Sequence, residues 1–96
     1  MITVKVKTIL TIAKIFGSSE VELSVPEGSS LRELIATLVD RWGEELASGL
    51  LETETQHVLP HIRLMVNGRD IAFLNRMETV LQNGDEILIL PPVSGG

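Results

Sequence analysis

Residues 86–92 read Glu-Ile-Leu-Ile-Leu-Pro-Pro. The apolar run and the two prolines in this segment indicate where it lies in the fold. Every residue from Ile87 to Leu90 is apolar, so a strand over residues 86–90 has two apolar faces. Such a strand is either covered on both faces or exposes one face to a partner. The two prolines end it, because proline cannot donate to the hydrogen-bond ladder of a sheet. We therefore expect a central strand that lies beside the first strand of the chain.

Alternation predicts two further strands near the N-terminus. Residues 2–7 and 20–25 alternate apolar and polar side chains, which is typical of half-buried strands. The apolar members are Ile2, Val4, Val6, Val21, Leu23 and Val25. Between the two strands, residues 8–17 lose this alternation and stop at a glycine. This stretch predicts either a longer first strand or a short helical turn around residues 11–16.

The most regular helical pattern covers residues 31–42. Its apolar positions recur in one stripe at helical spacing. They are Leu31, Leu34, Ile35, Leu38, Val39 and Trp42. Ser30 and Glu33 have the spacing of a capping box, in which each side chain satisfies a free backbone N–H at the start of the helix. Gly43 is the expected end, and Trp42 is expected to cover the core over the sheet.

Shorter elements are predicted between this helix and the last strand. Residues 44–51 favour a second short helix, and residues 62–66 favour a strand. Asn67-Gly68 is typical of a tight hairpin turn, because both residues tolerate positive φ. Residues 69–73 are then expected to return as a short strand, followed by a turn that packs Met77 on the core.

Two histidines, His57 and His61, are four residues apart, a spacing that metal ligands can have. Pro60 interrupts any helix that would place them on one face, and no third carboxylate or cysteine ligand lies near them. Zinc sites in proteins use three or four protein ligands. We therefore expect no metal site, and structural or solvent-exposed histidines instead.

Composition narrows the classes of function. The 96 residues are 44% hydrophobic and 22% charged, as in an ordinary folded domain, and carry a net charge of −5. An acidic surface disfavours nucleic-acid phosphate and suits a partner with a basic docking site. The absence of cysteine excludes disulfides, thiolate metal ligands and cysteine nucleophiles. No apolar run approaches a membrane span and the N-terminus lacks the pattern of a signal peptide, so we expect a cytoplasmic protein that binds neither nucleic acid nor membrane.

Together these elements predict an α+β roll, in which one main helix lies across one face of a mixed sheet. We expect one domain over residues 1–90. An extended tail, residues 91–96, is expected to follow it and to end in two glycines.

The C-terminal sequence resembles that of the ubiquitin-like sulfur carriers, and most of all the small subunit of molybdopterin synthase. In that family a strand ends in Val-Asn, and a Gly-Asp-Glu turn, an apolar strand, Pro-Pro and a terminal Gly-Gly follow. The matching residues here are Val66-Asn67, Gly84-Asp85-Glu86 and Pro91 to Gly96. The resemblance implies the β-grasp fold, which agrees with the predicted roll.

The resemblance also implies a chemistry at the last residue. In the family, an ATP-dependent activating enzyme adenylates the C-terminal carboxylate, and a persulfide sulfur then replaces AMP to leave a thiocarboxylate. In this sequence the reacting group would be the carboxylate of Gly96. The carrier would bind no cofactor, because the activating enzyme uses the ATP, and it would not be an enzyme alone. The implied sulfur acceptor is the large catalytic subunit of molybdopterin synthase, in the synthesis of the molybdenum or tungsten cofactor.

The composition of the tail suits this chemistry. The predicted threading tail comprises Pro91, Pro92, Val93, Ser94, Gly95 and Gly96. Its two prolines stiffen the exit from the sheet and set the direction of the last four residues. Its two glycines have no side chains and can pass through a channel too narrow for a Cβ atom. A stiff stalk with a slim tip would bring an acyl group into the active site of another protein.

Successive residues of a strand face opposite sides of a sheet, so Leu88 and Leu90 share one face and Ile87 and Ile89 share the other. The resemblance favours Leu90, beside the tail, as part of the surface that binds the partner, together with Leu88. Ile87 and Ile89 are then expected in the core.

Other acceptors stay open. The same chemistry could serve tRNA thiolation, or the synthesis of thiamin or cysteine. A ubiquitin-like protein modifier or adaptor would instead join Gly96 to lysine side chains through isopeptide bonds. The two prolines before the glycines favour the molybdopterin pathway modestly.

Overall fold

The structure, a computed structural model, describes residues 1–52, 54–55 and 57–91. Its five strands are β1 (Ile2–Thr8), β2 (Glu20–Val25), β3 (Arg63–Val66), β4 (Arg69–Asp70) and β5 (Glu86–Leu90). They form one sheet in the order β2-β1-β5-β3-β4. β1 and β5 pair in parallel, and all other neighbours are antiparallel. The prediction that the last strand lies centrally beside the first is confirmed.

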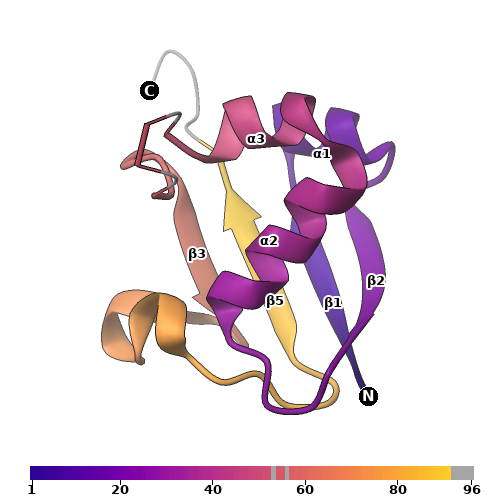
Figure 1. The fold of residues 1–96 in the computed structure, drawn as a ribbon, viewed down its shortest axis with the longest axis vertical. Helices are drawn as coiled ribbons and strands as arrows, with labels where there is room; N and C mark the ends of the chain where they lie inside the picture. The colour runs from indigo at the N-terminus through magenta and orange to yellow at the C-terminus, as the bar shows by residue number, and fades with distance from the viewer. Residues whose placement is uncertain (53, 56, 92–96) are drawn as a thin grey trace.

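Helices cover one face of this sheet (Figure 1). They are α1 (Leu10–Phe16), α2 (Leu31–Trp42) and α3 (Glu44–Leu50). α2 crosses the sheet diagonally, whereas α1 and α3 lie together near the end toward which β1 and β5 run (Figure 1). In the described part of the chain, the opposite face of the sheet has no helix over it and is called the open face below. This arrangement confirms the predicted roll.

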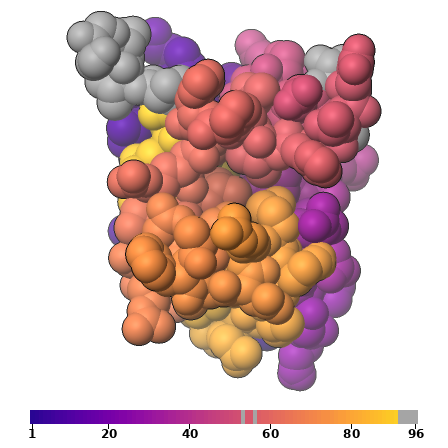
Figure 2. Space-filling model, turned by 90° about the vertical axis from the view of Figure 1, so that its left-hand side faces the viewer, coloured from indigo at the N-terminus to yellow at the C-terminus, as the bar shows by residue number. Residues whose placement is uncertain are grey.

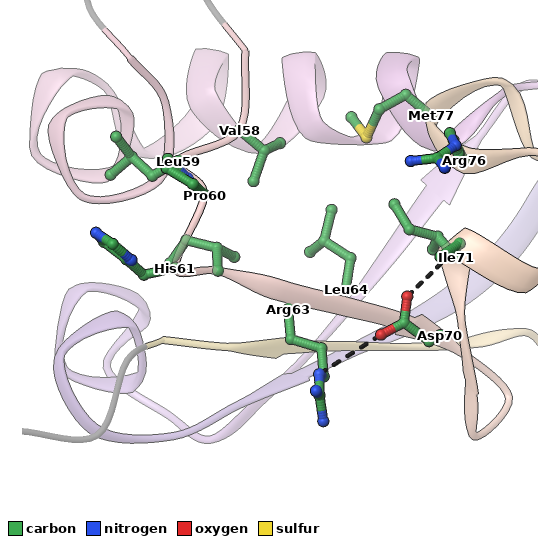
Figure 3. A pocket seen from close by; sticks show the side chains of 12 residues that line it. Val58, Leu59, Pro60, His61, Arg63, Leu64, Asp70, Ile71, Arg76 and Met77 are labelled. Carbon is green, nitrogen blue, oxygen red and sulfur yellow. Dashed lines mark hydrogen bonds and ion pairs between the residues drawn. The ribbon is translucent and has the colours of Figure 1, made fainter. Parts of the chain in front are cut away.

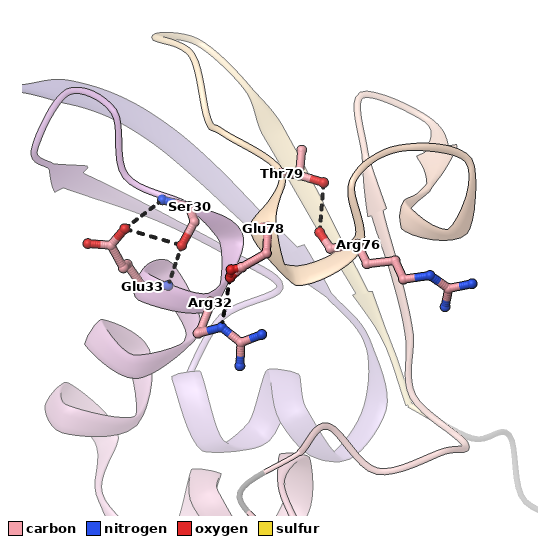
Figure 4. A network of polar contacts seen from close by, with 6 residues as sticks. All are labelled: Ser30, Arg32, Glu33, Arg76, Glu78 and Thr79. Carbon is pink, nitrogen blue, oxygen red and sulfur yellow. Dashed lines mark hydrogen bonds and ion pairs between the residues drawn. The ribbon is translucent and has the colours of Figure 1, made fainter.

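The start of α2 shows why its sequence is helical. The hydroxyl of Ser30 accepts a hydrogen bond from the backbone N–H of Glu33 at 3.2 Å, and the carboxylate of Glu33 accepts one from the N–H of Ser30 at 3.1 Å (Figure 4). The predicted capping box is therefore present. Gly43, with φ of 77°, ends the helix as expected. The buried side of α2 consists of Leu31, Leu34, Ile35 and Leu38.

Residues 10–16 form a helix, so the second of the two alternatives predicted for this stretch is correct. Gly17 ends it in the left-handed region, with φ of 79°. The ring of Trp42, predicted to lie over the sheet, packs against Phe16 of α1 at a centroid distance of 4.6 Å. Trp42 is only partly buried. It therefore extends the core toward α1.

The short strand predicted for residues 69–73 is wrong beyond Asp70. The carboxylate of Asp70 accepts a hydrogen bond from the N–H of Ala72 at 2.9 Å, which turns the chain out of the sheet. Two 3-10 helices follow, η1 (Ile71–Phe73) and η2 (Arg76–Glu78). β4 is thus only two residues long. The predicted hairpin turn is present, with Asn67 at φ of 52° and Gly68 at 82°.

The core lies between the helices and the sheet. Its strand residues are Ile2, Val4, Val6, Leu23, Val25, Leu64, Val66, Ile87 and Ile89. The helices contribute Ile12, Phe16, Leu31, Leu34, Ile35, Leu38, Leu46 and Leu50. Within the described residues, no helix is long and apolar enough to cross a membrane.

Candidate functional site at the end of the central strand

β5 ends at the side of the sheet where α1 begins. Thr8 of β1 lies beside Ile89 of β5 in the parallel register, so the two strands end together. Leu90 is half-buried and Pro91 is buried. The remaining predicted tail residues, Pro92, Val93, Ser94, Gly95 and Gly96, lie outside the described residues. The structure therefore describes the root of the tail, Pro91, and the surfaces around it.

A buried hydrogen bond holds this end of β5. The Oγ1 hydroxyl of Thr8 donates to the carbonyl oxygen of Ile89 at 2.7 Å, and Thr8 is 2% exposed. A buried hydroxyl is tolerated because it has such a partner. Alternation in β1 places Thr8 on the buried face, but the sequence gives no sign of which group it contacts. This bond and the ladder to β1 together fix the strand two residues before Pro91.

The two faces of β5 differ in burial. Ile87 and Ile89 are 0% exposed, which confirms that they belong to the core. Leu88 and Leu90 are half-buried and lie on the open face. Met65 of β3 lies opposite Leu88 and is also half-buried. These three residues, Met65, Leu88 and Leu90, form an apolar strip on the open face; a partner surface there remains a prediction.

Charged side chains border the apolar strip. Lys7, which is paired with Leu88 in the parallel register, has its Nζ atom 3.3 Å from Oε1 of Glu86 and 3.8 Å from Oε1 of Glu20. These side chains are 40–49% exposed, so each ion pair contributes little to stability. Their arrangement leaves an apolar centre with a charged border, the composition of a protein-binding surface.

Sequence reasoning missed two exposed apolar residues beside the root of the tail. Ile9 is 41% and Leu10 is 50% exposed, and they follow Thr8 directly at the end of β1. Leu10 has a φ of 55°, a left-handed conformation that is costly for a bulky side chain. The loss of apolar–polar alternation after residue 8 was the sequence signal that could have indicated these exposed residues. These residues widen the candidate partner surface beyond Leu88 and Leu90.

The part of the chain that the structure describes holds no metal-binding cluster. Within residues 1–52, 54–55 and 57–91, no group of three or more histidine, aspartate or glutamate side chains could hold a metal ion. His57 and His61 are both exposed.

Two archaeal proteins are similar to this chain in sequence. It is 29% identical over 86 residues to small archaeal modifier protein 3 of Haloferax volcanii, and the alignment covers 90% of each protein. It is 34% identical over 70 residues to a protein of Archaeoglobus fulgidus described as a candidate sulfur carrier, covering 73% of this chain and 77% of that protein.

Solved structures share the fold. The crystal structure of SAMP1 from Haloferax volcanii superposes with a TM-score of 0.84 at 26% identity, over 98% of this chain and 99% of that one. A Pyrococcus furiosus protein described as a candidate molybdopterin converting factor, subunit 1, superposes with a TM-score of 0.74 at 27% identity, over 97% and 100%. The fold is the ubiquitin-like β-grasp, as the resemblance implied.

The model of the ThiS family matches residues 9–96, a range that includes the tail. Members of this family are activated by ATP-dependent E1-like enzymes, and they pair with those enzymes or with enzymes that accept the sulfur. The family match, the Archaeoglobus relative and the β-grasp fold agree. This chain belongs to the ThiS family of ubiquitin-like sulfur carriers.

Proposed function

We propose that this chain carries sulfur as a thiocarboxylate on Gly96. The observation that carries the proposal is the family match, which runs through residue 96 and so includes the Gly-Gly end. A supporting observation is that the central strand β5 ends at Leu90, directly before Pro91. The two prolines and the two glycines then give the tail a stiff base and a slim tip.

The chemistry follows from the poor reactivity of a carboxylate. An activating enzyme joins the carboxylate of Gly96 to AMP from ATP and releases pyrophosphate. The outer sulfur of a persulfide attacks the acyl carbon, and AMP leaves. A thiol then cleaves the S–S bond, so that the sulfur remains on Gly96 and the thiol enters a disulfide. The carrier itself contributes no base or metal ligand to these steps; it contributes the acyl group and its presentation.

The apolar strip, with Ile9 and Leu10, is the surface we assign to the activating enzyme. The apolar strip lies on the open face and follows β5 to the point where Pro91 begins. A partner that binds the strip is therefore also close to the tail. Its apolar centre would provide the burial, and the charges around it would set orientation.

The acceptor is proposed from the relatives. Small archaeal modifier protein 3 aligns over 90% of both chains, which favours a protein modifier whose adenylated Gly96 is attacked by a lysine amine to form an isopeptide bond. The Archaeoglobus relative favours sulfur delivery, for tRNA thiolation or for thiamin or cysteine synthesis. The molybdopterin pathway, with the large catalytic subunit of the synthase as acceptor, has the support of the Pyrococcus structure and ranks after these.

Intact-mass measurement tests the proposal. The protein is incubated with the activating enzyme of its source cell, ATP and a persulfide donor. We expect a mass gain equal to the difference between sulfur and oxygen, located in the C-terminal peptide and dependent on ATP. Ser94→Ala serves as a matched control and should gain the same mass, whereas a chain that lacks Gly96 should gain none. Absence of any gain in the intact chain would refute the carrier function.

The acceptor is identified in a second step. The sulfur-loaded protein is offered unmodified tRNA, a thiazole-forming extract, or the large synthase subunit with pterin precursor. Lysine-linked conjugates are sought separately in the source cell by mass spectrometry. Discharge by the synthase subunit alone would restore the molybdopterin assignment, and conjugates on lysine would establish the modifier.

A further inference from the structure

A groove lies beside β3, on the side of the molecule that faces the viewer in Figure 2. One wall is formed by residues 58–62, and the other by η1 and Met77 (Figure 3). Its volume is about 520 Å³, within the usual range for binding pockets. Met65, Leu88 and Leu90 do not line it, so it is separate from the apolar strip of the open face.

Part of the groove lining is apolar. Four side chains, each from a different part of the chain, are directed toward the shared space (Figure 3). They are Val58, Leu64, Ile71 and Met77. Leu64 is 3% exposed, and the other three are partly buried against the core. A pocket of this kind favours an aliphatic or aromatic side chain of a ligand.

The backbone beside this interior is the edge of the sheet. β4 pairs with β3 only at Met65 and Val66 before Asp70 turns the chain away. Arg63 and Leu64 therefore have no strand neighbour on this side within the described ranges. An extended segment can lie along such an edge, with its side chains alternating between two sides. One side would enter the apolar interior, and the other would meet Arg63, which Figure 3 shows directed away from Val58.

Cationic groups border the groove, although the chain as a whole is acidic. Two arginines, Arg63 and Arg76, line it, against the single carboxylate of Asp70. That carboxylate is already 3.5 Å from Nε of Arg63. Arg76 has no carboxylate within 4.0 Å among the described residues. A ligand with carboxylates would match this local charge.

The backbone of Arg76 is strained. Its φ of 51° is in the left-handed region, where glycine or asparagine would cost less. Thr79 holds it there, because its hydroxyl donates to the carbonyl of Arg76 at 2.7 Å and accepts from the N–H of Asn75 at 3.1 Å. Figure 4 shows the side chain extending away from the neighbouring pair of Arg32 and Glu78. Strain of this kind concentrates at functional sites.

We propose that this groove binds an extended segment of a partner protein in which apolar and acidic residues alternate. The apolar side chains enter the space between Val58, Leu64 and Met77, and the segment runs along the edge at Leu64. The acidic side chains that alternate with them face Arg63, and a carboxylate at the end of the segment beside Met77 accepts paired hydrogen bonds from the guanidinium of Arg76, a geometry that a planar guanidinium favours. Pro91, the root of the tail, does not line the groove, so in this proposal the partner and the activating enzyme bind at different sites.

A library of synthetic hexapeptides tests the proposal. Its members alternate glutamate with valine, isoleucine, leucine or phenylalanine, and two control sets replace glutamate by lysine or the apolar residue by serine. Each peptide is titrated into isotope-labelled protein, and backbone amide shifts are followed by NMR. We expect acidic–apolar members to shift the amides of residues 62–64 and 71–77, and both control sets to bind at least about tenfold more weakly.

Variants separate binding from folding. Arg76→Glu should lower the affinity for the best peptide at least about tenfold, because it places two carboxylates next to each other. Arg69→Glu makes the same charge change at the exposed hairpin turn, outside the groove, and should leave the affinity nearly unchanged. Arg76→Gly should melt at an equal or higher temperature, since its φ is relaxed, and should still lose binding.

Each contrary result is decisive. The proposal is wrong if no acidic member binds below a Kd of about 1 mM, if the shifted amides lie elsewhere, or if lysine peptides bind as well. It is also wrong if Arg76→Glu and Arg69→Glu behave alike. Groove amides that shift with protein concentration alone would show that a second copy of the chain occupies the site.

Discussion

Asn67 and Asp85, separated by 18 positions, are joined by a hydrogen bond of 2.9 Å from Nδ2 of the asparagine to Oδ1 of the aspartate. Oδ1 of Asn67 also accepts from the N–H of Glu86 at 2.9 Å, and Oδ2 of Asp85 accepts from the N–H of Gln82 at 2.8 Å. The hairpin turn after β3 is thereby tied to the start of β5. This bond network fixes the register in which Val66 lies opposite Ile87. A slip by one residue would turn Leu88 and Leu90 into the core.

Two substitutions at Asn67 separate its hydrogen bonds from its backbone strain. Asn67→Gly keeps the positive φ at little cost but loses both side-chain hydrogen bonds, so the free energy of unfolding should fall by about 1–3 kcal/mol. Asn67→Ala loses the same bonds and adds the left-handed strain, roughly 1 kcal/mol more. Denaturant unfolding measures both. A glycine variant as stable as the parent would mean that the network does not hold the register.

The two faces of β5 should respond differently to substitution. Ile87→Ala or Ile89→Ala leaves a cavity in the core and should lower the free energy of unfolding by about 2–4 kcal/mol. Leu90→Glu places a charge on the open face, so folding should be retained while binding to the activating enzyme weakens. Thermal unfolding and calorimetric titration with that enzyme provide the two readouts. If Leu90→Glu unfolds the protein and Ile89→Ala does not, the faces have been assigned the wrong way round.

Leu10 offers a more direct test of the surface beside the tail. Asparagine tolerates the left-handed conformation and is polar, so Leu10→Asn should keep or slightly raise the melting temperature. It should also weaken binding to the activating enzyme, since an exposed apolar contact is lost. Thr11→Asn, at the neighbouring exposed position, is the control and should leave binding unchanged. Equal binding by both variants would remove Ile9 and Leu10 from the partner surface.

The buried hydroxyl of Thr8 should stabilise the end of β5. Thr8→Val keeps the shape but leaves the carbonyl of Ile89 without this donor, which should cost about 1–3 kcal/mol. Thr3→Val, on the exposed face of the same strand, should change stability by less than about 0.5 kcal/mol. Denaturant midpoints of the two variants can be compared directly. Equal midpoints would show that the Thr8 bond contributes nothing net.

Removal of Gly96 should separate function from folding. The melting temperature should stay nearly constant, because chain termini bury little surface, while sulfur loading is lost. One residue added after Gly96 should also abolish loading, since a reacting atom displaced by about 1 Å can lose a hundredfold in rate. Differential scanning calorimetry and intact mass give the two measurements. A truncated chain that still loads sulfur would contradict the assignment of Gly96.

Much of the fold could be predicted from short stretches of sequence. Alternation in residues 2–7 and 20–25 predicted β1 and β2, and Ser30 with Glu33 predicted the first turn of α2. Asn67-Gly68 predicted the hairpin turn. Each of these signals depends on backbone preference and on contacts within a few residues, so the adjacent residues are enough to predict the element. The resemblance of residues 84–96 to sulfur carriers likewise rests on contiguous residues.

Other features depend on segments that are distant in the sequence. Leucine and isoleucine are similarly apolar, so the pattern of β5 could not by itself assign Ile87 rather than Leu88 to the core; the position of α2 over one face settles it. The strand expected after residue 70 was replaced by η1, because the carboxylate of Asp70 caps Ala72. The groove beside β3 joins residues 58–62 to Met77, a contact that no local pattern encodes. Such contacts depend on burial and packing summed over the whole domain, which local sequence patterns do not contain.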